Sequence, residues 1–136
     1  MSLGILLRHY WRSTIVLCSI LYLSFAPPST FKEIPSVVEN EDKLVHLLMY
    51  GGLSFSLLLD LLTHLKSKFK SWHLLLIGML FPMLLGGMLE FFQPLYFAPR
   101  TGSWGDVAAN STGVMLNSIL FFLLKKTKLS RRFEQN

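Results

Sequence analysis

The chain has 136 residues, which is enough for one domain and leaves no room for a separate soluble module. Only 15% of the residues are charged, and the mean hydropathy of +0.46 is far too apolar for a soluble protein of this size. The formal net charge of +5 comes from basic residues that bracket apolar runs, so no nucleic-acid surface is predicted. The single cysteine, Cys18, excludes an intrachain disulfide and a zinc site built from cysteines.

Four apolar segments follow one another along the chain, and each predicts a membrane-spanning helix. A bilayer core of roughly 30 Å requires about 20 helical residues. The second and third segments meet this length, whereas the first and fourth need their flanking residues. The first segment resembles a signal peptide, but Pro27 directly after Ala26 disfavours cleavage and indicates a retained anchor. The predicted elements are spans at 11–27, 43–65, 72–93 and 106–125, with an outer loop at 94–105.

The basic residues predict how these spans are oriented. Positive residues gather in cytoplasmic loops and termini of membrane proteins. Ten of the thirteen Lys and Arg residues lie before the first span, between the second and third, or after the fourth. Both termini are therefore predicted in the cytoplasm of a bacterial cell, and the other side faces the periplasm or the exterior. The ten residues are Arg8, Arg12, Lys66, Lys68, Lys70, Lys125, Lys126, Lys128, Arg131 and Arg132.

The last three spans each carry polar side chains on one face at the outer end. Residues three or four apart share a helix face. Such groups are costly in hydrocarbon without partners, so they are expected to face one another or a water-filled recess. The polar positions are Asp42, His46 and Tyr50 in the second span, Glu90 and Gln93 in the third, and Asp106 and Asn110 in the fourth.

The depths of these groups match. At about 1.5 Å per residue, His46, Glu90 and Asn110 each lie roughly 5 Å below the outer end of their own span. Small residues follow at roughly 10 to 13 Å, where they would let the helix backbones approach closely. We therefore expect the second, third and fourth spans to pack together at their glycines and to bring the polar groups together. The glycines are Gly51, Gly52, Gly86, Gly87 and Gly113.

Three blocks in this order resemble the VanZ-like membrane proteins, over residues 42–117. The resemblance implies a small bacterial inner-membrane protein from a family whose namesake is associated with low-level resistance to the glycopeptide teicoplanin. It identifies relatives and does not imply a particular reaction. The blocks are Asp42-Lys43-x-x-His46-x-x-x-Tyr50, then Glu90-x-x-Gln93, then Arg100 with Asp106-x-x-x-Asn110-x-x-Gly113.

Each polar residue also has a purely structural interpretation. Asp42 and Lys43 suit a solvated helix start. Asp106 suits an N-cap of the fourth helix, and Asn110 a hydrogen bond between helices. The remaining structural roles are a neutral bonded ring for His46, a packed ring for Tyr50, an ion pair to Arg100 or Lys43 for Glu90, and a helix cap before Pro94 for Gln93.

A metal site is weighed and not predicted. His46, Glu90 and Asp106 offer nitrogen and oxygen ligands, but no HxxxH or HExxH pattern places two of them together on one helix. No cofactor motif is present either. Asp60, four residues before His64, belongs to a different part of the second span and is expected to reach the cytoplasmic interface.

Two functions remain open, with a third as a weaker alternative. In the first, the outer polar residues bind an anionic lipid headgroup, a cell-wall precursor or a partner membrane protein. In the second, Glu90 or His46 moves a proton on a polyprenyl- or phospholipid headgroup that Arg100 and Lys43 hold. In the third, the polar residues only lock a structural subunit of a membrane complex. The predicted binding residues are Lys43, His46, Tyr50, Glu90, Gln93, Arg100, Asp106 and Asn110.

Overall fold

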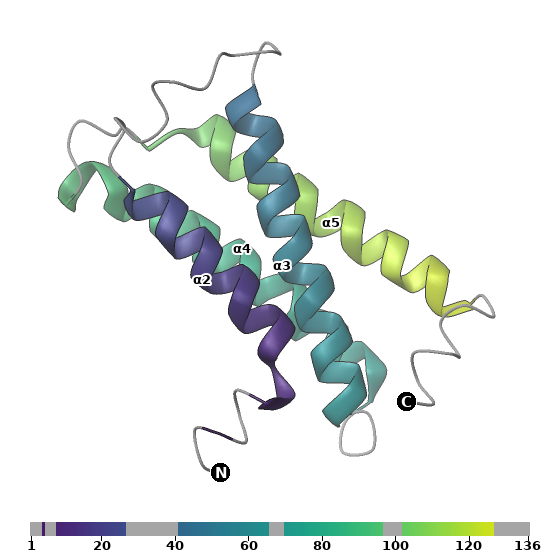
Figure 1. The fold of residues 1–136 in the computed structure, drawn as a ribbon. Coiled ribbons are helices and arrows are strands. Elements are labelled where there is room, and N and C mark those ends of the chain that lie inside the picture. The colour runs from purple at the N-terminus through teal and green to yellow at the C-terminus, as the bar shows by residue number, and fades with distance from the viewer. Residues whose placement is uncertain (1–3, 5–7, 27–40, 66–69, 97–101, 127–136) are drawn as a thin grey trace.

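The computed structural model describes Gly4 and residues 8–26, 41–65, 70–96 and 102–126. Four long helices make up these ranges, and the described residues contain no strand, so the predicted all-α class is confirmed (Figure 1). The helices are α2 (Trp11–Phe25), α3 (Glu41–Leu65), α4 (Ser71–Tyr96) and α5 (Trp104–Lys126).

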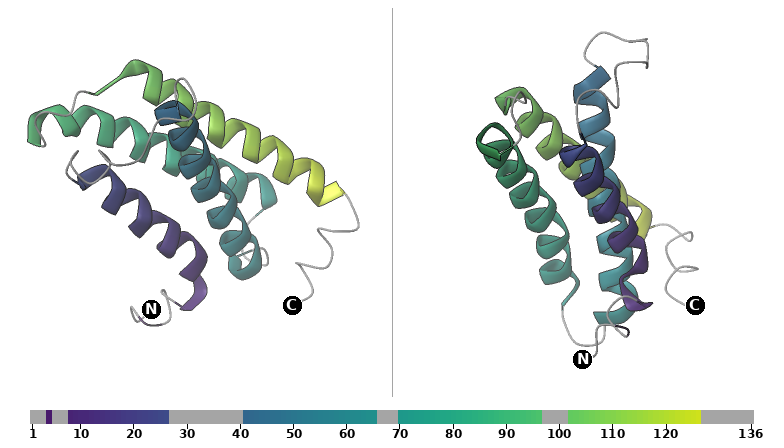
Figure 2. Two further views of the ribbon diagram at one scale, coloured as in Figure 1. Left: turned by 45° about the horizontal axis from the view of Figure 1, so that its top comes forward. Right: turned by 60° about the vertical axis from the view of Figure 1, so that its left-hand side comes forward.

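Helix α3 is the centre of the bundle. It contacts α2, α4 and α5, and α4 and α5 also contact each other. Helices that follow one another in the chain run in opposite directions, so the start of α3 lies at the same end as the end of α4 and the start of α5 (Figures 1 and 2). This arrangement brings together the ends that carry the predicted polar residues.

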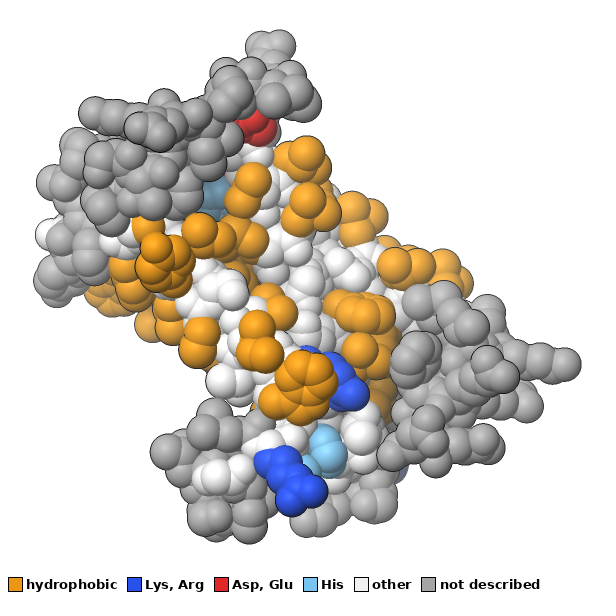
Figure 3. Space-filling view, viewed as in Figure 1, with side chains coloured by type: hydrophobic (Ala, Val, Ile, Leu, Met, Phe, Trp, Pro, Cys, Tyr) orange, Lys and Arg blue, Asp and Glu red, His pale blue; other side chains and the backbone are white. Residues whose placement is uncertain are grey.

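The outer surface of the bundle is apolar. Three helices, α3, α4 and α5, are long and apolar enough to cross a membrane, whereas α2 is a shorter apolar helix of 15 residues. Large side chains such as Leu84 and Leu95 are more than half exposed. Figure 3 shows hydrophobic side chains over the middle of one face, with Lys and Arg side chains near one end. A surface of this kind is stable against lipid and costly in water.

Helix α4 extends beyond its predicted end at residue 93. It continues through Pro94 to Tyr96, so the predicted loop at 94–105 is shorter than expected. Proline lacks an N–H and leaves the carbonyl four residues earlier, that of Glu90, without its helical donor. Gly102 packs directly against this carbonyl oxygen, where a Cβ would collide with it. Gly102, just before α5, therefore lies against the last turn of α4.

A second proline lies in the middle of α4. Pro82 frees the carbonyl of Gly78, and the Ser54 hydroxyl of α3 donates to that oxygen at 2.9 Å. Both Ser54 and Pro82 are buried. A side chain from the neighbouring helix thus satisfies the carbonyl that proline leaves open, which is how prolines are tolerated inside membrane helices.

The predicted close packing at glycines is confirmed at three positions. A Cβ on Gly113 would collide with the Leu47 carbonyl of α3, and one on Gly51 would meet Asn117 Nδ2 at 2.5 Å. At Gly86 a Cβ would lie 2.9 Å from Asn110 Nδ2. The prediction is wrong for the other two, Gly52 and Gly87, where a Cβ would meet nothing within 4 Å. In each glycine pair, only the first residue faces the neighbouring helix.

Asp60 does not reach the cytoplasmic interface as expected. Its side chain has 0% exposure and points at the start of α2. Oδ2 accepts the Ser13 hydroxyl at 2.7 Å and the Ser13 backbone N–H at 3.0 Å, and Oδ1 accepts Arg12 Nη1 at 3.1 Å. The buried charge of the carboxylate is stabilised by an arginine and by an N–H at the start of α2 that has no acceptor within its own helix. At the other end of α2, Gln93 of α4 donates to the Ser24 carbonyl at 3.5 Å.

Candidate functional site

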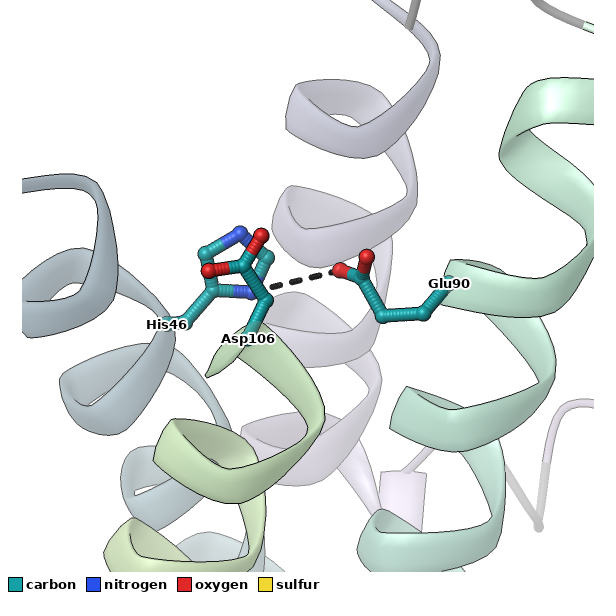
Figure 4. Close-up of side chains that lie close together, drawn as sticks. All are labelled: His46, Glu90 and Asp106. Carbon is teal, nitrogen blue, oxygen red and sulfur yellow. Dashed lines mark ion pairs between the residues drawn. The ribbon is translucent and has the colours of Figure 1, made fainter. Parts of the chain in front are cut away.

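Four polar residues from three helices meet at the outer end of the bundle. His46 lies on α3, Glu90 on α4, and Asp106 and Asn110 on α5. His46 Nδ1 is 3.0 Å from Asn110 Oδ1 and 3.7 Å from Glu90 Oε1. Figure 4 shows the side chains of His46, Glu90 and Asp106 turned towards one another. The predicted convergence of His46, Glu90 and Asn110 is confirmed, and we call these four residues the outer polar cluster.

Glu90 links this cluster to the start of α5. Its side chain is only 5% exposed, although the residue lies in a helix that is apolar enough to cross a membrane. Oε2 accepts the backbone N–H of Ser103 at 3.2 Å, while Oε1 faces His46. An acid buried in this way is expensive and marks a functional site by default in a membrane protein.

Ser103, and not Asp106, caps α5. The Ser103 hydroxyl accepts the Gly105 N–H at 3.1 Å, and its carbonyl accepts the N–H groups of Asp106 and Val107. The capping interpretation of Asp106 is therefore wrong, because Asp106 lies three residues inside the helix. The Ser-x-x-Asp spacing resembles a capping box, in which the acid would bond the N–H of the capping serine. Glu90 accepts that N–H instead.

Asp106 is consequently left with a carboxylate oxygen that has no donor. Its Oδ1 is buried and has no hydrogen-bond partner within the described part of the chain. Nearly all buried polar atoms in native proteins are paired, so such an atom calls for an explanation. One side-chain nitrogen of Asn110, Nδ2, shares this property, although Asn110 is only 1% exposed.

The ring of Tyr50 lies parallel to the ring of His46, one helical turn away on α3. The interplanar angle is 5°, and the ring centroids are 6.3 Å apart. Tyr50 is 1% exposed and belongs to the main apolar core with Ile20, Leu53 and Val114. This packing agrees with the structural interpretation of Tyr50 as a packed ring.

The remaining predicted binding residues lie around the cluster or away from it. Lys43 is partly exposed; its ammonium lies 3.8 Å from Asp42, and its stem passes beside Gly105 at the start of α5. Gln93 bonds to α2 and is not the helix cap that its position before Pro94 suggested, since α4 continues past it. The predicted cation Arg100 lies outside the described residues.

An apolar cavity of about 500 Å³ opens beside Glu90, between the end of α4 and the start of α5. Glu90 and Ser103 are the polar contributors to a lining that also includes Gly87, Phe91, Leu95 and Val107. Phe91, Leu95 and the neighbouring Trp104 are 63–89% exposed on the outside of the bundle. The cavity therefore opens sideways, towards the region that lipid would occupy, and Glu90 is one of the residues that line it.

The sequence analysis missed two residues of this site. Gly102 packs against the Glu90 carbonyl, and Ser103 bonds the Glu90 carboxylate and caps α5. The Ser103-x-x-Asp106 spacing was the available signal, because it is a helix-start pattern. Together the cluster can hold or move a proton between His46 and Glu90, bind a cation through its carboxylates, or orient the head of a molecule in the cavity.

Each of the three blocks that carry the VanZ-like resemblance contains at least one residue of the outer polar cluster. Membership of that family stays a prediction from the motifs. No protein-family model, no curated protein and no solved structure matches this chain.

Proposed function

We propose that this chain is a VanZ-like protein of the bacterial inner membrane that binds an amphiphile from the outer leaflet. The outer polar cluster contacts the headgroup, and the cavity beside it holds part of the apolar chain. One observation carries the proposal: Glu90, whose carboxylate belongs to the cluster, is also one of the residues that line the apolar cavity. A polar head attached to an apolar tail is the chemistry that fits such a pair of surfaces.

The proposed topology has four spans and cytoplasmic termini. The distribution of Lys and Arg supports it, because the basic residues flank the ends opposite the outer polar cluster. Helix α2 would be about 22 Å long at 1.5 Å per residue, shorter than the bilayer core. Arg12, near the start of α2, is 42% exposed while it bonds to the buried Asp60, and a span shorter than the bilayer core is tolerated by local thinning of the bilayer.

This topology has its own test. An alkaline phosphatase reporter, which is active only outside the cytoplasm, is fused after Asn136 and, separately, within residues 97–101. We expect the first fusion to be inactive and the second to be active. The reverse pattern would place the outer polar cluster at the cytoplasmic face and overturn the assignment to the outer leaflet.

The headgroup is proposed to be anionic, as in a phospholipid, a polyprenyl phosphate or a lipid-linked cell-wall precursor. Lys43 supports this because its stem lies beside the start of α5 and can carry the ammonium over the cluster. Phosphate oxygens are strong acceptors for such a cation. A partner membrane protein that occupies the same cavity is the competing ligand.

Catalysis on the same amphiphile is the second candidate. His46 lies between an amide oxygen and a carboxylate, at 3.0 Å from Asn110 and 3.7 Å from Glu90, which orients the ring as a general acid or base would require. A binding protein leaves the headgroup intact, whereas an enzyme changes it. Lipid profiles of membranes with and without the protein therefore separate the two.

The binding proposal is tested on the full chain, purified in mild detergent and analysed by native mass spectrometry. Lys43→Gln is the informative variant, because it removes the cation that is proposed to hold the anionic headgroup. Lys70→Gln, an exposed lysine just before α4 at the opposite end of the bundle, is the matched control. We expect a retained amphiphile in the wild type and the control, and about tenfold less in Lys43→Gln, as the loss of one charged hydrogen bond predicts.

Two results would contradict the proposal. The first is a wild-type protein that retains only the bulk lipids of the membrane in their bulk proportions. The second is a Lys43→Gln variant, folded by circular dichroism, that retains as much amphiphile as Lys70→Gln.

A further inference from the structure

The outer polar cluster contains three side chains of the kinds that bind divalent metal ions. His46, Glu90 and Asp106 each offer one ligand atom, and these atoms all lie within 4.8 Å of one another. Ligands about 2.1 Å from a common ion are separated by roughly 3.0 to 4.2 Å. The ligand atoms therefore need to approach one another by only about 1 Å to bind one ion. They come from three helices, and Figure 4 shows them facing a common point.

The environment of Asp106 is the second observation that points to a ligand. Its Oδ1 is buried, and no group in the described ranges donates to it. The one N–H that a first-turn acid normally accepts, that of Ser103, bonds to Glu90. A buried carboxylate oxygen without a donor, beside a second carboxylate, is costly. A cation between the two carboxylates would give Asp106 Oδ1 a partner and offset the repulsion between the two negative charges.

His46 has the outer support that metal-binding histidines require. Ligating histidines hold their second ring nitrogen in a hydrogen bond to a carbonyl or carboxylate, which fixes the tautomer and the ring plane. His46 Nδ1 lies 3.0 Å from Asn110 Oδ1, and the ring lies parallel to that of the buried Tyr50. The same Nδ1 is the ring atom 3.7 Å from Glu90 Oε1, so a metal bound at Nε2 would keep the contact with Asn110, whereas a metal bound at Nδ1 would replace it.

The charges of the cluster bear on the ligand. Two carboxylates and one imidazole form a surface that repels an anionic headgroup. An anionic headgroup and this acidic cluster are compatible when a divalent cation lies between them.

We propose that His46, Glu90 and Asp106 bind one divalent cation of the Mn²⁺ to Zn²⁺ series, and that this ion holds the phosphate of the amphiphile. Imidazole favours these metals over Ca²⁺ and Mg²⁺. Three protein ligands leave open coordination positions, which phosphate oxygens fill. The phosphate part of this inference rests on the proposed function, whereas the metal site stands on the three residues alone.

A salt bridge between a protonated His46 and Glu90 is the competing interpretation of the same contacts. It accounts for the 3.7 Å separation of Nδ1 and Oε1. It gives no partner to Asp106 Oδ1. The two interpretations therefore differ in what they predict for Asp106, which only the metal site requires.

The test uses the full chain in detergent, stripped with EDTA and titrated with Mn²⁺ alone, with free Mn²⁺ measured by electron paramagnetic resonance. We expect one bound Mn²⁺ per chain. Asp106→Asn should weaken binding more than about tenfold, since even changes next to a metal ligand cost that much. Asp42→Asn, which removes an exposed acid from α3, should leave the affinity unchanged. Absence of bound Mn²⁺ at millimolar ion, or equal affinities for the two variants, would overturn the site.

A second measurement needs no variant. Diethyl pyrocarbonate modifies accessible histidines, and peptide mass spectrometry reads each one separately. Mn²⁺ should protect His46 in the wild type and leave His64, at the opposite end of α3, unprotected. Equal modification of His46 with and without Mn²⁺ would contradict the site even if Asp106→Asn failed to fold.

Lipid retention in the presence of EDTA separates this inference from the proposed function. If the wild type binds Mn²⁺ and loses its amphiphile when the metal is removed, both hold. If it retains the amphiphile equally in EDTA and in Mn²⁺, the metal bridge is wrong and the binding function stands. If it binds Mn²⁺ but no amphiphile under either condition, the proposed function fails and the metal site stands.

Discussion

Asp60 of α3 accepts two hydrogen bonds from Ser13 of α2, one from the hydroxyl at 2.7 Å and one from the backbone N–H at 3.0 Å. Tyr10, the residue that precedes α2, makes no side-chain capping bond. Asp60 therefore caps α2 from a neighbouring helix, a role that serine or aspartate usually plays from within the chain just before a helix. This contact fixes the inner end of α2, the shortest of the four helices, against the central helix.

Removing this cap should destabilise the bundle. Asp60→Ala leaves the buried Ser13 N–H and the Arg12 guanidinium without this acceptor, so we expect a loss of about 1–3 kcal/mol in the free energy of unfolding. Asp60→Asn should lose less, because an amide oxygen still accepts from Ser13. Unfolding in mixed micelles with increasing sodium dodecyl sulfate, followed by circular dichroism, measures both. An Asp60→Ala variant as stable as the control Asp42→Ala would show that the cap contributes nothing.

The contact between α3 and α5 should depend on Gly113. A Cβ there would collide with the Leu47 carbonyl, and backbone cannot move aside as a side chain can. Gly113→Ala should therefore cost about 1–3 kcal/mol, as overpacking of a core does. Gly52→Ala is the matched control: a Cβ there meets nothing within 4 Å, and alanine should stabilise α3 by up to about 1 kcal/mol. Equal effects of the two changes on the unfolding midpoint would refute close packing at Gly113.

Ser54 and Pro82 should be energetically coupled through the Gly78 carbonyl. With Pro82 present, Ser54→Ala leaves that carbonyl without a donor, at a cost of about 1–2 kcal/mol. In a Pro82→Ala background, the alanine N–H bonds the same carbonyl within α4, so the loss of Ser54 should cost little. A double-mutant cycle on the unfolding free energy measures the coupling. Strictly additive effects would mean that Ser54 does not compensate for the proline.

The helices and much of the outer polar cluster could be predicted from the sequence. Apolar runs of sufficient length fixed the helices, and the direction of each span placed His46, Glu90 and Asn110 at one depth. Because these residues lie at similar depths, close packing of α3, α4 and α5 at their glycines places the polar side chains near one another. The convergence of these residues therefore followed from helical geometry and chain direction, without knowledge of any contact between helices.

Other features depend on which face of a helix packs against which neighbouring helix. The residues around one position in the sequence do not show this. Asp60 was expected at the interface because it lies near the inner end of its span, four residues before His64. Its partners are instead Arg12 and Ser13, nearly fifty residues earlier. Likewise, Ser103 competes with Asp106 as the cap of α5, and only the position of Glu90 decides the outcome. Pro94 indicated a helix end, but proline in a last turn removes only one bond, so α4 continued to Tyr96.

Filling the cavity is the most direct test of amphiphile binding at the outer polar cluster. Gly87 lines the cavity, and a Cβ on it meets nothing within 4 Å, so Gly87→Leu places a side chain in the cavity without disturbing the contacts between helices. Gly52→Leu adds the same side chain to an equally open position outside the cavity.

The decisive measurement is the amount of amphiphile retained per chain, by native mass spectrometry, in these two variants and the wild type. The account predicts about tenfold less in Gly87→Leu, a loss within the range expected for a few displaced methylene contacts, and no change in Gly52→Leu. Equal retention in all three proteins would contradict the proposal that this cavity and the buried carboxylate of Glu90 form the binding site.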